Sequence, residues 1–179
     1  MPEIAGIRRP HVWGIGLGRT GTTSLCAALR LLGYRRVVHN PRFEQLARID
    51  AASDNGCTIF YKYLDRRHPG SKFVLTIRDL EPWLESARYI HDTIPVGGPQ
   101  ADIMIMRRMM LYETVAYDRD RFAAAWERHH ADVRRYFRDR PDDLLELRMM
   151  DGEGWERLCP FLGLPAPDDP FPHLHRRAP

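Results

Sequence analysis

Short apolar runs alternate with amphipathic stretches along this chain, and each kind of run predicts one kind of element. Val12–Leu17 and Lys72–Arg78 are the clearest apolar runs, and the second is rich in β-branched and aromatic residues. Runs of this length and composition favour buried strands. "RRVVHN" at residues 35–40 and "DDLLELRM" at residues 142–149 predict two further short strands.

Helices are expected between these strands. Leu25, Ala28, Leu29 and Leu32 recur at helical spacing, and Gly33 is placed to end that helix. Similar patterns predict helices near residues 59–64, after residue 80, over two segments before residue 137, and over residues 155–162. Strands and helices that alternate in this way predict an α/β fold with a layered parallel sheet.

The length of 179 residues suits a single domain at 1–179, with a core at about residues 11–165 and a proline-rich tail at 165–179. The net charge of +3 fits a small anionic ligand and lies well below the charge density of a nucleic-acid-binding protein. We therefore expect a small-molecule partner and no nucleic acid. The oligomeric state leaves no mark on the sequence.

The three cysteines are far apart and form no C-x-x-C pair, so we expect neither a disulfide framework nor a metal site. The N-terminal segment lacks the apolar stretch of a secretory signal. No apolar run approaches the ~20 residues of a membrane span. The expectation is a soluble, cytoplasmic protein with no membrane partner.

The stretch "GIGLGRTGTTSL" at residues 14–25 is the first candidate for chemistry, and two common interpretations fit it poorly. The dinucleotide pattern at Gly16, Gly18 and Gly21 also needs an acidic residue about 20 positions later, where this chain has "RRVVHN". The triphosphate loop G-x-x-x-x-G-K-[ST] needs a lysine where this chain has Thr22. The only lysines, Lys62 and Lys72, are far from this loop in the sequence.

A third interpretation fits better: a strand and a turn lead into a helix, and the N-terminus of this helix binds a single anionic group. The backbone N–H groups of Gly21, Thr22 and Thr23 would face that anion with the help of the helix dipole. The hydroxyls of Thr20, Thr22 and Thr23 would add donors, and Arg19 a fixed charge. Such a loop suits a phosphate that carries one further group and needs no metal.

A second motif strengthens this interpretation. Arg78 ends the strand in "FVLTIRDLEPWLESARY", and Ser86 lies eight residues later in the following helix. Ligands of open α/β sheets bind beyond the carboxyl ends of the strands, and the arginine fork matches phosphate oxygens. Two separated phosphate sites predict a nucleotide that is phosphorylated at two positions.

"GLGRTGTTSL" and "FVLTIRDLEPWLESARY" together resemble the sulfotransferases that use 3′-phosphoadenosine 5′-phosphosulfate (PAPS). The tail "GEGWERLCPFLGLPAPDDPFPH" resembles the short, single-domain microbial branch of that superfamily, and the resemblance runs from about Val12 to His173. It implies a P-loop-type parallel sheet flanked by helices in three layers. It also implies a transferase that releases adenosine 3′,5′-bisphosphate (PAP) without a metal, acting on a hydroxyl or amine of an unidentified acceptor.

The resemblance assigns roles to the residues of both motifs. The loop that holds the 5′-phosphosulfate would be Gly18, Arg19, Thr20, Gly21, Thr22 and Thr23, with Arg19 where many family members have lysine. Arg78 and Ser86 would hold the 3′-phosphate. Arg19 is also a candidate catalytic residue, because negative charge builds on the bridging oxygen.

The acceptor also needs a base, which in the wider family is a histidine or carboxylate between the two motifs. The candidates are His39, Asp50 and Asp54, and we prefer Asp54, which follows "IDAAS", then His39. Arg176 and Arg177 are further candidates for contact with the donor.

Two other features have structural interpretations. The methionines of "IMIMRRMM" (residues 103–110) predict a helix face in the core, with an acceptor pocket as the second option. His129 and His130 lack the i, i+4 spacing of a metal pair and predict a solvated or capping pair. The competing functions are a kinase-like phosphotransferase that uses ATP and Mg²⁺, and a catalytically inactive nucleotide-binding protein.

Overall fold

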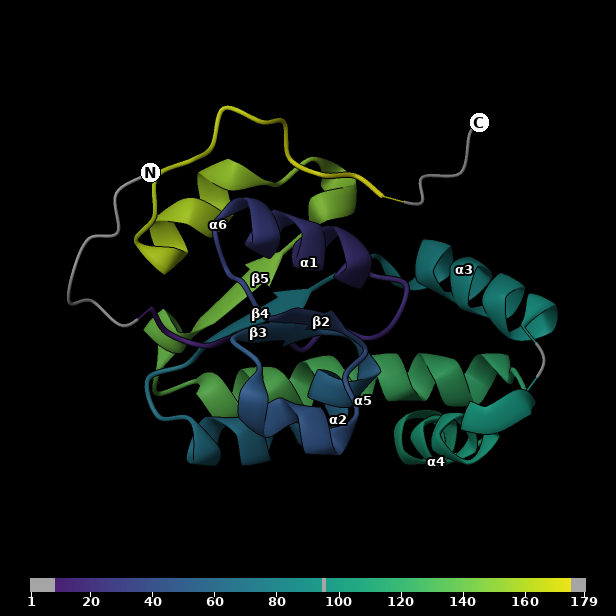
Figure 1. Ribbon diagram of the computed structural model, residues 1–179. Helices are drawn as coiled ribbons and strands as arrows, with labels where there is room; N and C mark the ends of the chain where they lie inside the picture. The colour runs from purple at the N-terminus through teal and green to yellow at the C-terminus, as the bar shows by residue number, and fades with distance from the viewer. Residues whose placement is uncertain (1–8, 95, 175–179) are drawn as a thin grey trace.

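A five-stranded parallel sheet forms the centre of the computed structural model, which describes residues 9–94 and 96–174. The strands lie in the order β2-β3-β1-β4-β5, and every neighbouring pair is parallel (Figure 1). Their bounds are β1 Val12–Gly14, β2 Val37–His39, β3 Ala51–Ser53, β4 Lys72–Thr76 and β5 Leu144–Leu147. The prediction of an α/β fold with a parallel sheet is confirmed.

Helices cover both faces of this sheet. They are α1 Thr22–Leu31, α2 Asn55–Arg67, α3 Leu80–Thr93, α4 Ala101–Tyr112, α5 Arg119–Phe137 and α6 Trp155–Leu162, with short 3₁₀ segments at η1 Phe43–Arg48, η2 Gly98–Gln100, η3 Pro141–Asp143 and η4 Met149–Asp151. Figure 1 shows α1 and α6 on one face and α2 and α5 on the other. Both α3 and α4 lie to one side of the layers.

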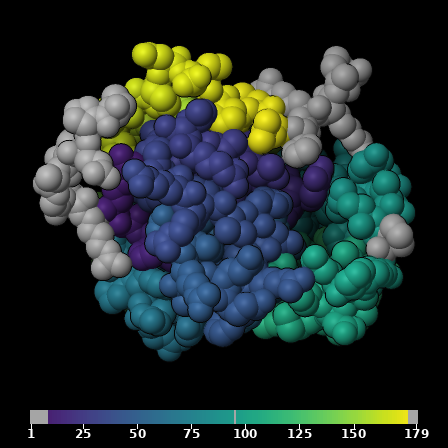
Figure 2. Space-filling view, viewed as in Figure 1, coloured from purple at the N-terminus to yellow at the C-terminus, as the bar shows by residue number. Residues whose placement is uncertain are grey.

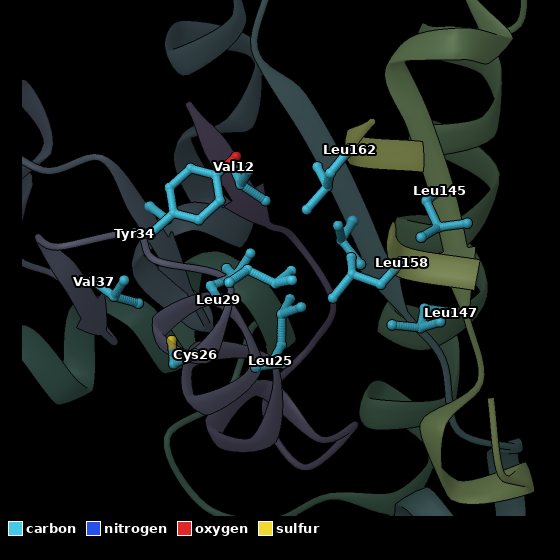
Figure 3. Close-up of a cluster of buried hydrophobic side chains, with 14 of the residues drawn as sticks. Val12, Leu25, Cys26, Leu29, Tyr34, Val37, Leu145, Leu147, Leu158 and Leu162 are labelled. Atoms are coloured by element: carbon cyan, nitrogen blue, oxygen red, sulfur yellow. The ribbon is translucent and has the colours of Figure 1, made fainter. Parts of the chain in front are cut away.

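The core under α1 and α6 is aliphatic (Figure 3). Leu25 and Leu29 of α1 pack with Leu158 and Leu162 of α6 over the strand residues of this face. The helix α1 ends as its sequence predicts. Gly33 has a φ of +85° and Tyr34 N–H donates to the carbonyl of Leu29, so the glycine closes the last turn in the left-handed conformation that other residues avoid.

The core under α2 and α5 is aromatic and corrects one prediction. Trp13 and Phe73 of the sheet pack there against Phe137 of α5. His130 is buried and His129 is half-buried, because α5 packs along its length on this face. His129 Nε2 donates to the carbonyl of Ile15 (2.7 Å), and His130 is 1% exposed with Nδ1 bonded to the carbonyl of Trp126 (2.6 Å).

The prediction of a methionine core in α4 is wrong. Met106, Met109 and Met110 are each about half exposed, and Met104 lines the cavity described below. The buried residues of α4 are Arg107 and Tyr112 instead. The helix lies at the edge of the layers against α2 and α5, so only one narrow face of it is covered.

The sheet topology places a crevice at one end of the molecule. The chain leaves β1 toward β2 and β3 on one side and later continues from β4 to β5 on the other. Connections that depart in opposite directions open a crevice beyond the carboxyl ends of adjacent strands, here β1 and β4.

Candidate active site

A cavity of about 400 Å³ occupies this crevice. Its lining comes from the loop after β1, the ends of β2 and β3, Arg78 after β4, and the helices α3 and α4. In Figure 2 the molecule is hollowed between the purple and blue atoms of the first third of the chain and the teal atoms of α3 and α4. The two motifs singled out by sequence therefore face one space.

The loop after β1 is built on glycines that no other residue can replace easily. A Cβ on Gly16 would lie 2.0 Å from Thr76 Oγ1 and 2.4 Å from the carbonyl oxygen of the same residue. Gly21 has a φ of +102° at the N-cap of α1, and Arg19 has a φ of +77°. The close approach to β4 and the left-handed turns fold residues 18–21 back over the start of the helix.

This loop leaves a row of donors without acceptors. Within the described part of the chain, no hydrogen-bond acceptor is found for the backbone N–H groups of residues 19–24. The first turn of α1 contains no acidic residue, and its N-cap makes no side-chain bond. Unpaired N–H groups at the positive end of a helix dipole form an anion-binding site.

Thr20 does not contribute its hydroxyl to this site, contrary to the sequence interpretation. Its side chain is fully buried, and Oγ1 donates to the carbonyl of Leu17 (2.7 Å) and bonds to Thr76 Oγ1 (2.6 Å). Only the backbone N–H of Thr20 remains for a ligand. The hydroxyl instead fixes the loop to β4, as Trp83 does from α3 by donating to the carbonyl of Gly18 (2.9 Å).

The second motif meets the first at the cavity. Arg19 Nε donates to Ser86 Oγ of α3 (3.1 Å), and Arg78 lines the same cavity as the glycine loop. Trp126 Nε1 holds the backbone of Arg78 by donating to its carbonyl (3.2 Å). The neighbouring carboxylate of Asp79 is bound by Arg148 at 2.7 Å. Two arginines from separate motifs thus line one cavity, and Ser86 contacts the first of them.

His39 and Asp54 lie together beside the start of α1. His39 Nε2 is 3.1 Å from Asp54 Oδ2 and 3.2 Å from both Thr22 Oγ1 and Thr23 Oγ1. Thr22 Oγ1 donates to Asp54 Oδ2 at 2.5 Å. The strand register explains the meeting, because His39 of β2 pairs opposite Ser53 of β3, the residue before Asp54.

Asp54 is held as an anion. Burial by itself raises the pKa of this carboxyl, but the hydrogen bond and charge of His39, the Thr22 hydroxyl and the Asn55 N–H outweigh it and lower the pKa below its ordinary value of 3.8. Asp54 also has a φ of +89°, rare for a residue with a side chain. Strain of this kind gathers at functional sites.

Asp50, the third candidate base, lies elsewhere. Its carboxylate pairs with Arg36 at 2.7 Å on the surface, and it does not line the cavity. Among the three candidates, the structure brings only His39 and Asp54 to the anion site.

Several cavity residues escaped sequence reasoning because they lie on α4 and in the tail. Arg107 is 8% exposed, with its two terminal nitrogens each 2.5 Å from Asn40 Oδ1 and the carbonyl oxygen of Pro41. Leu174 lines the cavity and its N–H donates to Ser24 Oγ (2.9 Å). The candidates Arg176 and Arg177 lie outside the described residues.

Neither a metal-binding cluster nor a membrane-spanning helix is present among the described residues. Across residues 9–94 and 96–174 no three histidine, cysteine or acidic side chains are grouped to hold a metal ion. Over the same ranges no helix has the length and apolar character needed to cross a membrane.

The sequence matches one protein family over most of its length. The model of the sulfotransferase domain family matches residues 11–45 and 41–179 of this chain. Ava biosynthesis cluster protein M of Aspergillus versicolor is 25% identical over 208 aligned positions, which cover 89% of this chain and 78% of that protein.

Comparison with solved structures agrees on the fold. A sulfotransferase from Alicyclobacillus acidocaldarius aligns with a TM-score of 0.55 and 14% identity over 97% of this chain and 87% of its own. The mouse sulfotransferase SULT7A1, solved in complex with PAP, aligns with a TM-score of 0.51 and 14% identity over 90% of this chain and 62% of its own. Both are similar to this chain in fold.

Proposed function

This chain belongs to the sulfotransferase family, and we propose that it transfers a sulfuryl group from PAPS to a hydroxyl or amine of a small-molecule acceptor, with PAP as the second product. The observation that carries the proposal is the convergence of two cationic motifs on one cavity. PAPS is negatively charged at its 5′ and 3′ positions, and this cavity is lined by donors of both motifs, the glycine loop and Arg78.

The residues present fit such a donor. The unpaired N–H groups of residues 19–24 and the guanidinium of Arg19 are suited to the 5′-phosphosulfate. Arg78 and Ser86 are suited to the 3′-phosphate. The absence of lysine from the loop matters less for this donor, because it carries no β- and γ-phosphate charge to neutralise.

Catalysis would depend on hydrogen-bond donors and a positive charge that are already in position before the reaction begins. When bound, PAPS supplies an activated sulfuryl group and a good leaving group. Arg19 and the N–H groups of Thr22 and Thr23 would stabilise the negative charge that develops on the bridging oxygen. These donors are fixed by the loop and the helix, so little reorganisation is needed.

We assign the acceptor proton to His39, with Asp54 as its partner. Asp54 is 7% exposed, and its oxygens already accept from Asn55, Thr22 and His39. A carboxylate that is so well hydrogen-bonded, with a lowered pKa, is a weak base. His39 is more exposed and lines the cavity, so it can receive a proton while Asp54 orients its ring and stabilises its charged form.

Thermal stabilisation by nucleotides tests the proposal without an acceptor. A ligand at 100 times its dissociation constant adds about 2.7 kcal/mol to the free energy of unfolding. We expect PAP to raise Tm clearly more than AMP, ADP, NADP or ATP with magnesium, and Arg78→Ala to remove the advantage of PAP. The exposed Arg138→Ala, which loses a pairing with Asp139 far from the cavity, is the matched control.

Two results would overturn the proposal. Stabilisation by ATP with magnesium that equals that of PAP would favour a phosphotransferase. Tight PAP binding with no PAP released from PAPS by any acceptor would indicate a nucleotide-binding protein without catalysis.

A further inference from the structure

We infer that the acceptor is an apolar hydroxyl compound that carries an acidic group, and that Arg108 of α4 binds this group. The inference rests on the proposed function, since it concerns the cavity wall formed by α3 and α4 and not the groups assigned to the donor. Three features of the cavity support it: its apolar wall, its surplus of arginines and the surroundings of Arg108.

The wall opposite the glycine loop is apolar. It is formed by the end of α3 and the first turns of α4, through the side chains Ala87, Ile90, Ile94, Ile103 and Met104. The only carboxylate among the described lining residues is Asp54, which is engaged with His39. A sugar needs several polar partners for its hydroxyls, whereas this wall suits a flat or aliphatic carbon skeleton.

The cavity contains more arginines than the donor uses. Four line it, and the proposed function assigns Arg19 and Arg78 to the two ends of PAPS. Arg107 is bound to Asn40 and Pro41, next to His39. Arg108 remains without a role.

Arg108 is half-buried and has one hydrogen-bond partner among the described residues, the carbonyl of Val115 at 2.9 Å. No carboxylate in the described ranges lies within ion-pair distance of it. Burial lowers the pKa of Arg108, and Tyr112 is the one group that offsets this. A guanidinium that has lost water without gaining a counter-ion is unfavourable, and an anionic ligand relieves the cost.

The neighbouring imidazole of His91 does not compete with Arg108 for an anion. His91 of α3 also lines the cavity. Burial has the largest effect and lowers the pKa of His91; the bond to the Ala87 carbonyl raises it, and the charge of Arg108 lowers it further. A neutral His91 leaves Arg108 as the charged group at this end. Arg107, which contacts the segment after His39, and Arg108 follow one another in α4, so an acceptor acid bound by Arg108 would lie beside α4 in the same cavity as the proposed base.

Binding to the PAP complex tests the inference directly. The protein is saturated with PAP and titrated calorimetrically with matched pairs of phenols: 4-hydroxyphenylacetate against 4-hydroxyphenylacetamide, and 6-hydroxy-2-naphthoate against its amide. Tyramine and glucose complete the panel. We expect each acid to bind at least tenfold more tightly than its amide, and tyramine and glucose not to bind.

Two variants show which residue is responsible. Arg108→Gln should reduce the acid-to-amide ratio below threefold while PAP affinity stays within twofold of the wild type. Arg88→Gln removes a charge from an exposed position of α3 outside the cavity and should leave both quantities unchanged.

The outcomes separate this inference from the proposed function. Equal binding of acids and amides, or no binding of any phenol, with PAP still bound, would overturn the inference alone. A loss of PAP affinity in Arg108→Gln would assign Arg108 to the donor and overturn it as well. Failure of the wild type to bind PAP would overturn both.

Discussion

Replacing Asp54 by asparagine removes one charge from the centre of the proposed site and changes little else. Asparagine has the shape of aspartate and keeps the same backbone conformation at φ +89° and ψ −175°, whereas alanine would also remove every side-chain acceptor. The amide can still accept from the Asn55 N–H, which lies 2.6 Å from Oδ1. The bonds from Thr22 Oγ1 at 2.5 Å and His39 Nε2 at 3.1 Å lose their charged acceptor.

The size of the effect follows from these two bonds. Hydrogen bonds to charged groups contribute about 1–2 kcal/mol more than those to neutral groups, so for two bonds we expect a loss of roughly 2–4 kcal/mol in the free energy of unfolding. For a chain of this length that lowers Tm by roughly 5–15 °C. Turnover should fall at least about 100-fold, because His39 loses the partner that orients it, while PAP affinity should stay within about threefold since Asp54 donates nothing to the anion site.

The pH dependence gives an independent signature. The pKa of Asp54 in the folded protein is lowered from 3.8, so in acid the unfolded chain binds a proton that the folded one refuses. The stabilising contribution is therefore present above about pH 4 and lost as the pH falls below it. The difference in unfolding free energy between the wild type and Asp54→Asn should shrink below pH 4.

The assay follows PAP released from PAPS well below the Tm of the variant, with the phenol of the binding panel that gives the fastest wild-type rate. Asp50→Asn is the matched control, because that carboxylate pairs with Arg36 on the surface, and its turnover should equal the wild type. Unchanged turnover in Asp54→Asn, with PAP bound normally, would refute the assignment of Asp54 and His39.

Two further predictions concern the scaffold of the site. Gly16→Ala would place a Cβ 2.0 Å from Thr76 Oγ1, so we expect overpacking to lower the free energy of unfolding by about 1–3 kcal/mol and to weaken PAP binding. Gly97→Ala is the control, because no atom lies within 4 Å of its Cβ, and calorimetric scans should show neither effect. Burial lowers the pKa of His129 from 6.5 to about 4. Between pH 6.5 and pH 4 the ring is therefore protonated in the unfolded chain but not in the folded one. The free energy of unfolding falls by up to roughly 3 kcal/mol as the pH drops through that range. In urea titrations His129→Gln should lose this part of the slope, and parallel curves for wild type and variant would contradict it.

The elements with strong local signals could be predicted from the sequence. The apolar strand at Lys72–Thr76, the helix closed by Gly33 and the glycine loop before Thr22 depend on contacts and backbone conformations within a few residues. The strand Ala51–Ser53 has three small residues and no alternation, so the pattern of the sequence did not predict it.

What the sequence could not predict depends on tertiary packing. The methionines of α4 look like core residues until the helix is seen at the edge of the layers, and the histidine pair of α5 looks polar until the sheet covers it. Arg107 and Arg108 have no local motif. They reach the cavity because α4 folds back beside the loop after β2, an arrangement fixed by contacts more than 60 residues apart in the chain.

A calorimetric titration of the wild type and Arg78→Ala with PAP and with AMP, which lacks the 3′-phosphate, tests most directly whether two anion sites hold one donor. Hydrogen bonds to charged groups contribute about 1.5–3 kcal/mol, so PAP should bind the wild type at least about tenfold more tightly than AMP, and Arg78→Ala should bind the two nearly equally with unchanged AMP affinity. Equal affinity of the wild type for PAP and AMP, or a PAP preference that survives in Arg78→Ala, would contradict the account.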